Sequence, residues 1–391
     1  MGFNQTDYQK LHVSFADQYA AGIRRYLPKR AFWKNDNWAN PDQIPPQSAG
    51  LTGTPKRLPI PPIQRAAITA IRDSLAPSAT ARSLLATADQ GRVTAGFEFD
   101  PESTSGATYT SQHREVFFNA GGWLTRFDTV DQFMPWAGYF AAHELGHVAQ
   151  HRQSGPDYGR WSLRYRLMHQ IMATRHYEAA ADAVAVDVAW QLKDAGKPEM
   201  WQVLHGDPHD AHLAQAYARS IAKNPDNAVN GKARRAVHDA WFKDPLAVLH
   251  YDQVVLDNTR TVLDVLVAQQ IADFPDKQAG QLAGEAGRFR VTKEQIRDYA
   301  VMPDGVDHLR LKDHADVWDD RYTQPSSPSM LRQAELMHDM MQRLAAGQIL
   351  MEGDFDALDK AKGIISPKTN VVAWRARRQG RGPSPAPSPD S

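Results

Sequence analysis

The chain of 391 residues is long enough for one large or two ordinary domains with a buried core. Lysine and arginine together number 45, as do aspartate and glutamate, so no net charge attracts polyanions. We therefore expect no nucleic-acid partner. The absence of cysteine excludes disulfides, thiolate metal sites and cysteine nucleophiles, so that any bound metal must be held by histidines and carboxylates.

The first residues, MGFNQTDYQKLH, lack the basic and apolar regions of a secretory signal. No later stretch reaches the roughly 18 apolar residues of a membrane span. We expect a soluble protein without integral membrane association, either cytoplasmic or delivered by a route that needs no signal peptide. Gly2 and Thr6 fit the loose myristoylation pattern, but the bulky Phe3 argues against acylation.

A proline-rich run follows an N-terminal segment, 7–35, whose apolar residues have mixed helical spacing. The run from Asn40 to Pro62 contains seven prolines, which rules out a helix or a central strand and predicts an extended arm. From Gln64 to Leu75 the apolar residues recur at helical spacing, and this pattern predicts a helix.

Three short stretches between 92 and 119 have the residue pattern of strands. Alternate residues of RVTAGFEF are apolar, and ATYT and REVFFN repeat this pattern on either side of SQH. The pattern predicts a small antiparallel sheet that directly precedes a helix.

Two helices are predicted next. The first contains FAAHELGHVAQH, with Pro135 expected in its first turn. The second is long, from about Leu163 to Leu192, because its apolar residues share one face. Beyond residue 200 the chain is predicted to be mostly helical, and the tail from Ser366, rich in Arg, Pro and Ser, is expected to be disordered at its end.

The stretch HELGH carries the strongest chemical signal in the chain. On a helix, a step of four residues rises about 6 Å and turns about 40°, so His143 and His147 project from one face and can reach one ion. Glu144 lies beside the first histidine, where its carboxylate can accept a proton from a metal-activated water. This H-E-x-x-H arrangement predicts a Zn²⁺ site, provided that a third ligand exists.

The third ligand has two common sources. One class extends the motif to H-E-x-x-H-x-x-G-x-x-H, but Gln150 and Gln153 stand at the glycine and third-histidine positions and exclude it. The other takes a glutamate from a following helix, with an aspartate one turn later. HYEAAADAVA supplies Glu178 as the candidate third ligand and Asp182 as the carboxylate that would orient a ligand histidine.

HELGH and EAAAD together resemble the gluzincin metallopeptidases, whose pattern is H-E-x-x-H followed by a helix with E-x-x-A-D. The stretch from VFFN through YEAAADAVAVDVAWQL is similar to a group of uncharacterised bacterial proteins classed as metallopeptidases, and the resemblance covers about 90–200. It implies a zincin-like α+β fold, mostly helical, with a small antiparallel sheet before the active-site helix. It also implies that the strand in REVFFN binds an extended substrate backbone.

The chain is accordingly predicted to divide into four parts: an N-terminal helical segment with a proline-rich arm (1–62), a zincin-like catalytic core (63–200), a helical C-terminal region (201–365) and a disordered tail (366–391). Gluzincins usually supply a histidine or tyrosine that stabilises the oxyanion. No motif identifies it here, and the candidates are His176, Tyr177, Tyr158, His250 and Tyr251.

Other histidines have simpler interpretations. His151 continues the four-residue series but has drifted about 80° around the helix, so we expect it to face solvent. The trio His205, His209 and His212 in HGDPHDAH is interpreted as a polar loop before a helix start rather than a second metal site.

The sequence therefore predicts a zinc metallopeptidase, most simply an endopeptidase, with Glu144 as general base and a protein or peptide as substrate. Two alternatives stay open. One is a binding or scaffold protein that keeps a metal without turnover, and the other is a zinc amidohydrolase acting on a non-peptide amide. The sequence gives no indication of oligomeric state.

Overall fold

The computed structural model describes residues 2–25, 60–101, 105–111, 114–124, 126–154, 164–271, 284–311 and 316–363. The expected tail at 366–391, the candidate Tyr158 and most of the proline-rich run lie outside these ranges. The described part is mostly helical, with one small sheet, as the sequence predicts. None of its helices combines the length and apolar character needed to cross a membrane.

The chain divides into two compact units that alternate along the sequence. The first comprises Met1–Arg152, Val184–Gln215 and Met302–Gly305. The second comprises Gln153–Ala183, Ala216–Val301 and Val306–Ser391. The division falls within the long helix α7 (Leu167–Asp194), whose residues up to Ala183 belong to the second unit. These two units do not correspond to the four parts predicted from the sequence, and the four-part division stays a prediction.

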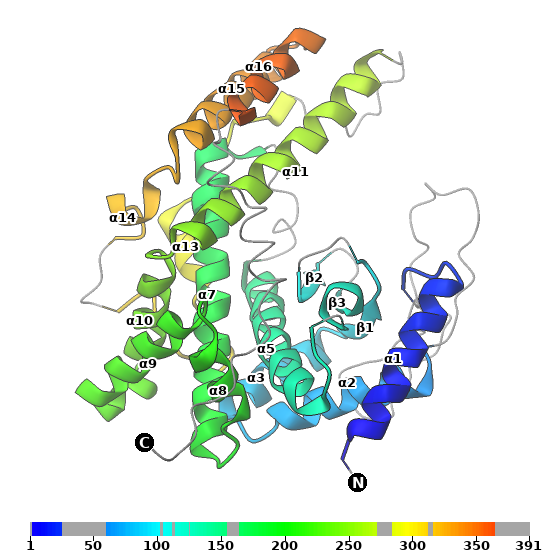
Figure 1. Cartoon of the computed structure of the whole chain (residues 1–391). Coiled ribbons are helices and arrows are strands. Elements are labelled where there is room, and N and C mark those ends of the chain that lie inside the picture. Colours follow the sequence, from blue (N-terminus) through cyan, green and yellow to red (C-terminus); the bar gives the residue numbers. More distant parts are fainter. Residues whose placement is uncertain are drawn as a thin grey trace. The chain divides into compact units, whose positions relative to one another are not determined.

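The sheet of the first unit has three strands, β1 (Thr94–Glu98), β2 (Ala107–Thr110) and β3 (Glu115–Asn119), in the order β1-β3-β2 (Figure 1). The three predicted strands are confirmed, but the all-antiparallel sheet is wrong. β3 pairs with β2 antiparallel and with β1 parallel, because the chain crosses over after β1 and returns through the β2–β3 hairpin.

The central position of β3 also corrects the expected role of REVFFN. Both edges of β3 are paired within the sheet, so its backbone groups cannot receive an extended peptide. The edge strands of the described sheet are β1 and β2.

Helices pack around this sheet in the first unit. The predicted helix at 64–75 is confirmed as α2 (Pro62–Leu75), which contacts both α1 (Gln5–Ala20) and β1. Between α1 and α2, the buried amide of Gln64 donates to Ser14 and to Gln18. The other elements here are α3 (Ala79–Gln90) and the short α4 (Ala120–Leu124).

Helix α5 (Val130–Ser154) carries the HELGH stretch. Pro135, expected in the first turn, lies inside the helix, because the helix starts five residues earlier than the proline suggested. The hydroxyl of Thr129 accepts the amide of Gln132 at 3.3 Å and caps the earlier start. Pro135 is buried, so packing offsets the missing N–H bond.

The predicted long helix at 163–192 is confirmed as α7. Farther along the chain come α8 (Glu199–Gly206), α9 (Ala211–Lys223), the 3₁₀ turn η3 (Pro225–Ala228) and α10 (Lys232–Trp241). The Asp207 carboxylate accepts the amides of His209 and Asp210, and so caps the loop before α9. The interpretation of HGDPHDAH as a polar helix start is therefore confirmed.

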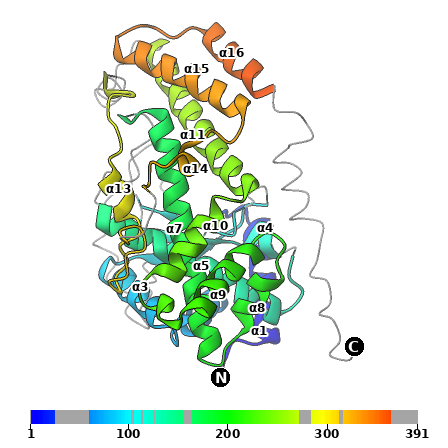
Figure 2. The same cartoon turned by 90° about the vertical axis from the view of Figure 1, so that its left-hand side faces the viewer.

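The second unit has its own core, formed by α11 (Pro245–Ile271), α15 (Pro328–Ala345) and α16 (Glu352–Gly363). Figures 1 and 2 show α15 beside both α16 and α11. Leucine and methionine fill this core, among them Leu263 and Met341, both fully buried. The short helices α13 (Lys293–Asp298) and α14 (Asp320–Thr323) complete the described elements.

A buried ion pair lies within the second unit. Arg175 on α7 donates to both carboxylate oxygens of Asp252 on α11, at 2.7 and 2.6 Å. A further nitrogen of Arg175 donates to the carbonyl oxygens of Tyr322 and Gln324. Each of the two charged side chains is at most 2 % exposed, so the pair depends on this complete set of bonds.

Candidate metal centre

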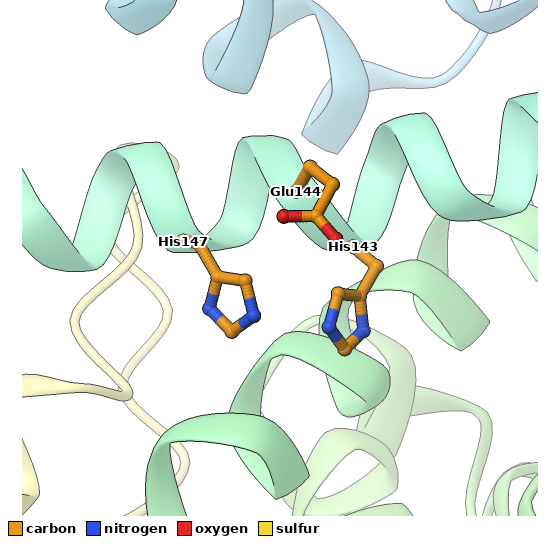
Figure 3. Close-up of side chains that lie close together, drawn as sticks. All are labelled: His143, Glu144 and His147. Carbon is orange, nitrogen blue, oxygen red and sulfur yellow. The ribbon is translucent and has the colours of Figure 1, made fainter. Parts of the chain in front are cut away.

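His143, Glu144 and His147 lie together in the buried middle of α5. The imidazoles of His143 and His147 project from the same side of the helix, and the Glu144 carboxylate lies beside them (Figure 3). One potential ligand atom from each residue can be chosen so that all three lie within 4.8 Å of one another. The imidazole centroids are 4.6 Å apart and the ring planes cross at 89°. The helical geometry expected from the sequence is thus confirmed.

The Glu144 carboxylate is held by the sheet. Its Oε2 atom accepts the backbone N–H of Tyr109 in β2, with an N···O distance of 2.6 Å. Because β2 is an edge strand, this N–H is directed at α5 and not at β3. Charge-assisted bonds of this kind are short and strong, so the carboxylate is fixed in its rotamer.

A second polar contact reaches His147. Its Nδ1 atom lies 2.8 Å from Oε1 of Gln150, one turn farther along the same helix. Gln150 is fully buried, and both histidines and Glu144 are less than a tenth exposed. The imidazole is therefore oriented by a neighbour on its own helix.

His151 and the Tyr109 side chain lie next to this group. Their rings pack edge to face with centroids 6.0 Å apart, and His151 is partly buried, so it faces solvent with only part of its surface. Burial lowers the pKa of His151, and the positive charge of Arg114 lowers it further. Burial raises the pKa of Tyr109 to about 12, against the opposing charges of Arg114 and Arg152.

The donor set fits a divalent metal ion. Two imidazoles and a carboxylate, less than a tenth exposed and within 4.8 Å, offer the nitrogen and oxygen ligands that zinc and its neighbours accept. Among the described residues, no other cluster of three or more such groups is found, and His205, His209 and His212 form none.

Glu178 and Asp182 lie one turn apart on α7, in the part that belongs to the second unit. Both are partly buried. The Oδ2 atom of Asp182 accepts the indole N–H of Trp241 on α10 at 3.0 Å. Their predicted roles as ligand and orienting carboxylate stay predictions from the sequence pattern.

The four described candidates for oxyanion stabilisation also belong to the second unit. His176 is fully buried, with Nδ1 at 3.1 Å from Nε2 of His238 and Nε2 at 3.0 Å from the carbonyl oxygen of Val317. Both ring nitrogens of His176 are thus engaged inside the unit.

The other three candidates make ring contacts in the same unit. Tyr177 packs edge to face on Tyr299, with ring centroids 5.6 Å apart. The rings of His250 and Tyr251 contact each other on α11, and Tyr251 also contacts Trp241. Both residues of the α11 pair are partly buried.

A buried His-Glu-His group on one helix, held against the edge of a small sheet, is the kind of site that metal-dependent hydrolases use. Residues 54–264, more than half of the chain, match the family described as "Putative metallopeptidase family (DUF6782)", and the chain belongs to this family. No curated protein and no solved structure matches the chain.

Two contacts of the site were not foreseen from the sequence. In the sequence, Gln150 is notable only because it stands where the extended motif requires a glycine. A polar side chain three residues after a candidate ligand is nevertheless a usable signal of a contact with that ligand. The Tyr109 contact had no local signal, because it joins residues 35 positions apart.

Proposed function

We propose that this protein is a zinc-dependent peptidase that cleaves protein or peptide substrates. One observation carries the proposal: His143, Glu144 and His147 form a buried, closely spaced group on one helix, in a chain that belongs to a metallopeptidase family. The lack of cysteine and the imidazole ligands favour zinc over softer or purely oxygen-bound metals.

The residues have distinct roles in the proposed reaction. His143 and His147 would hold the metal, and the E-x-x-A-D pattern supports Glu178 as third ligand and Asp182 as an orienting carboxylate. When bound, zinc supplies Lewis acidity that brings the pKa of a water molecule near 7. Glu144 would act as the general base that takes a proton from the attacking water and would then give that proton to the leaving amine.

The hydrogen bond from Tyr109 supports the role of Glu144 as base. It fixes one carboxylate oxygen, and the carboxylate keeps an oxygen within 4.8 Å of a ring nitrogen of both His143 and His147. A residue that acts as general base benefits from such fixed placement, because misplacement costs rate.

The H-E-x-x-H and E-x-x-A-D pair supports membership of the gluzincin type, and we further propose that the activity is that of an endopeptidase. The oxyanion would then be stabilised by the metal together with one donor from His176, Tyr177, His250 or Tyr251. Of these four candidates, His176 is disfavoured as the donor, because its two ring nitrogens already contact His238 and the carbonyl oxygen of Val317.

The test is to incubate the purified protein with a denatured proteome and to sequence the new termini, with and without a chelator. New termini that require the metal, and that the Glu144→Gln variant does not produce, support the proposal. Zinc binding without new termini would favour a scaffold role or hydrolysis of a non-peptide amide. Absence of zinc binding would refute the proposal altogether.

A further inference from the structure

We infer that Gln150 is a positioning residue for the metal, whose side-chain oxygen selects the histidine tautomer that can ligate. The inference depends on the metal-binding part of the proposed function but not on peptide cleavage. It starts from the 2.8 Å separation of Gln150 Oε1 and His147 Nδ1.

A neutral imidazole carries one N–H, and its other nitrogen has a lone pair. The side-chain oxygen of Gln150 can only accept, so the nitrogen that faces it carries the proton. His147 then donates through Nδ1–H, and Nε2 keeps the lone pair that a metal needs. The reverse tautomer would place a proton on Nε2 and block ligation through that atom.

The surroundings of Gln150 favour this fixed arrangement. The side chain is fully buried, so losing a hydrogen bond there leaves a polar group unsatisfied at a cost. The three-residue spacing places Gln150 and His147 on adjacent positions of one helix surface. The ligand and the group that orients it therefore move as one rigid element.

The amide also differs in charge from the usual orienting group. Carboxylates commonly accept the second N–H of a metal-bound histidine and raise the basicity of the ring. Gln150 orients His147 without adding a negative charge beside the metal. The Gln150→Glu variant should consequently bind zinc at least as tightly as the wild type, whereas Gln150→Leu should bind it about 10- to 100-fold more weakly.

The first measurement needs no substitution at Gln150. Long-range ¹H–¹⁵N correlation spectra of the metal-free, histidine-labelled protein show which nitrogen of each neutral ring carries the proton, with His147→Gln used to assign the signal. An Nδ1–H signal for His147 is expected. An Nε2–H signal would overturn the inference, whether or not any Gln150 variant folds.

The second measurement is the zinc dissociation constant, obtained by competition with a chelating dye. The matched control is Gln64→Leu, since Gln64 is also fully buried and hydrogen-bonded in the first unit but contacts α1. We expect weakened binding for Gln150→Leu, recovery for Gln150→Glu and no change for Gln64→Leu. Wild-type affinity in Gln150→Leu, or equal weakening by both leucine variants, would overturn the inference.

Peptide cleavage is assayed separately. A protein that shows the Nδ1–H tautomer and the expected order of zinc affinities, but cleaves no peptide, upholds the role of Gln150 and refutes the proposed peptidase. Metal-dependent cleavage by a protein with the Nε2–H tautomer upholds the peptidase and refutes the role of Gln150.

Discussion

The backbone nitrogen of Tyr109 lies 2.6 Å from the Oε2 atom of Glu144 and donates a hydrogen bond to it. The bond links the edge strand β2 to the middle of α5, so the sheet fixes the carboxylate that the proposed reaction uses as base.

The first prediction concerns Glu144. The Glu144→Gln variant should retain zinc, because His143 and His147 are unchanged, but lose about 100- to 10,000-fold in cleavage rate with the loss of the base. Elemental analysis and cleavage of the wild-type substrate measure the two effects. Cleavage at a rate near that of the wild type would contradict the mechanism, whatever the metal content.

The second prediction concerns the two histidines. His143→Ala or His147→Ala should each abolish stoichiometric zinc, since only one imidazole ligand of the described group would then remain. Zinc per chain after dialysis is the measurement. His205→Ala is the control, because His205 is exposed and outside the group. Full metal content in both site variants would refute the site.

The third prediction tests the carboxylates of α7. Glu178→Ala should weaken zinc binding and activity together. Asp182→Asn should lower zinc affinity or cleavage activity by about 10- to 100-fold. Asp194→Ala, an exposed carboxylate at the end of the same helix, should change neither. If Glu178→Ala behaves like Asp194→Ala, the third ligand must be sought elsewhere.

The fourth prediction concerns the buried ion pair. Asp252→Ala leaves the buried guanidinium of Arg175 without its carboxylate and should lower the free energy of unfolding by about 3–5 kcal/mol. Urea denaturation of the metal-free protein measures this change. Glu335→Ala, which breaks an exposed pair with Arg332, should cost less than about 1 kcal/mol. Equal effects would contradict the prediction.

The fifth prediction is a pH dependence of stability. Burial is the largest cause that lowers the pKa of five histidines: His12, His151, His169, His176 and His338. Below the ordinary histidine pKa of about 6.5 the unfolded chain therefore binds more protons than the folded one, and stability falls as the pH falls.

The measurement for this prediction is the urea midpoint at about pH 7 and at a pH about one unit below the ordinary histidine pKa, with a chelator present so that metal release does not contribute. We expect the lower midpoint at the lower pH. The carboxylates with lowered pKa, such as Asp316 and Asp354, change their charge below this range and do not interfere. A higher midpoint at the lower pH would contradict this prediction.

The sequence by itself determined the local parts of this protein. The four-residue spacing of His143 and His147 places both rings on one side of any helix, and the structure confirms it. The alternation of apolar residues predicted all three strands, and the helical periodicity predicted α2 and α7. These successes share one cause, because each pattern depends only on the geometry of its own element.

The tertiary structure decided everything that joins distant segments. Alternation is the same for parallel and antiparallel strands, so only the crossover placed β3 in the centre and β2 at the edge. The capped start at Thr129 and the burial of Pro135 overrode the preference of proline for a first turn. The bond between Tyr109 and Glu144 exists because that edge meets α5, and a contact across 35 residues has no periodicity for a sequence to display.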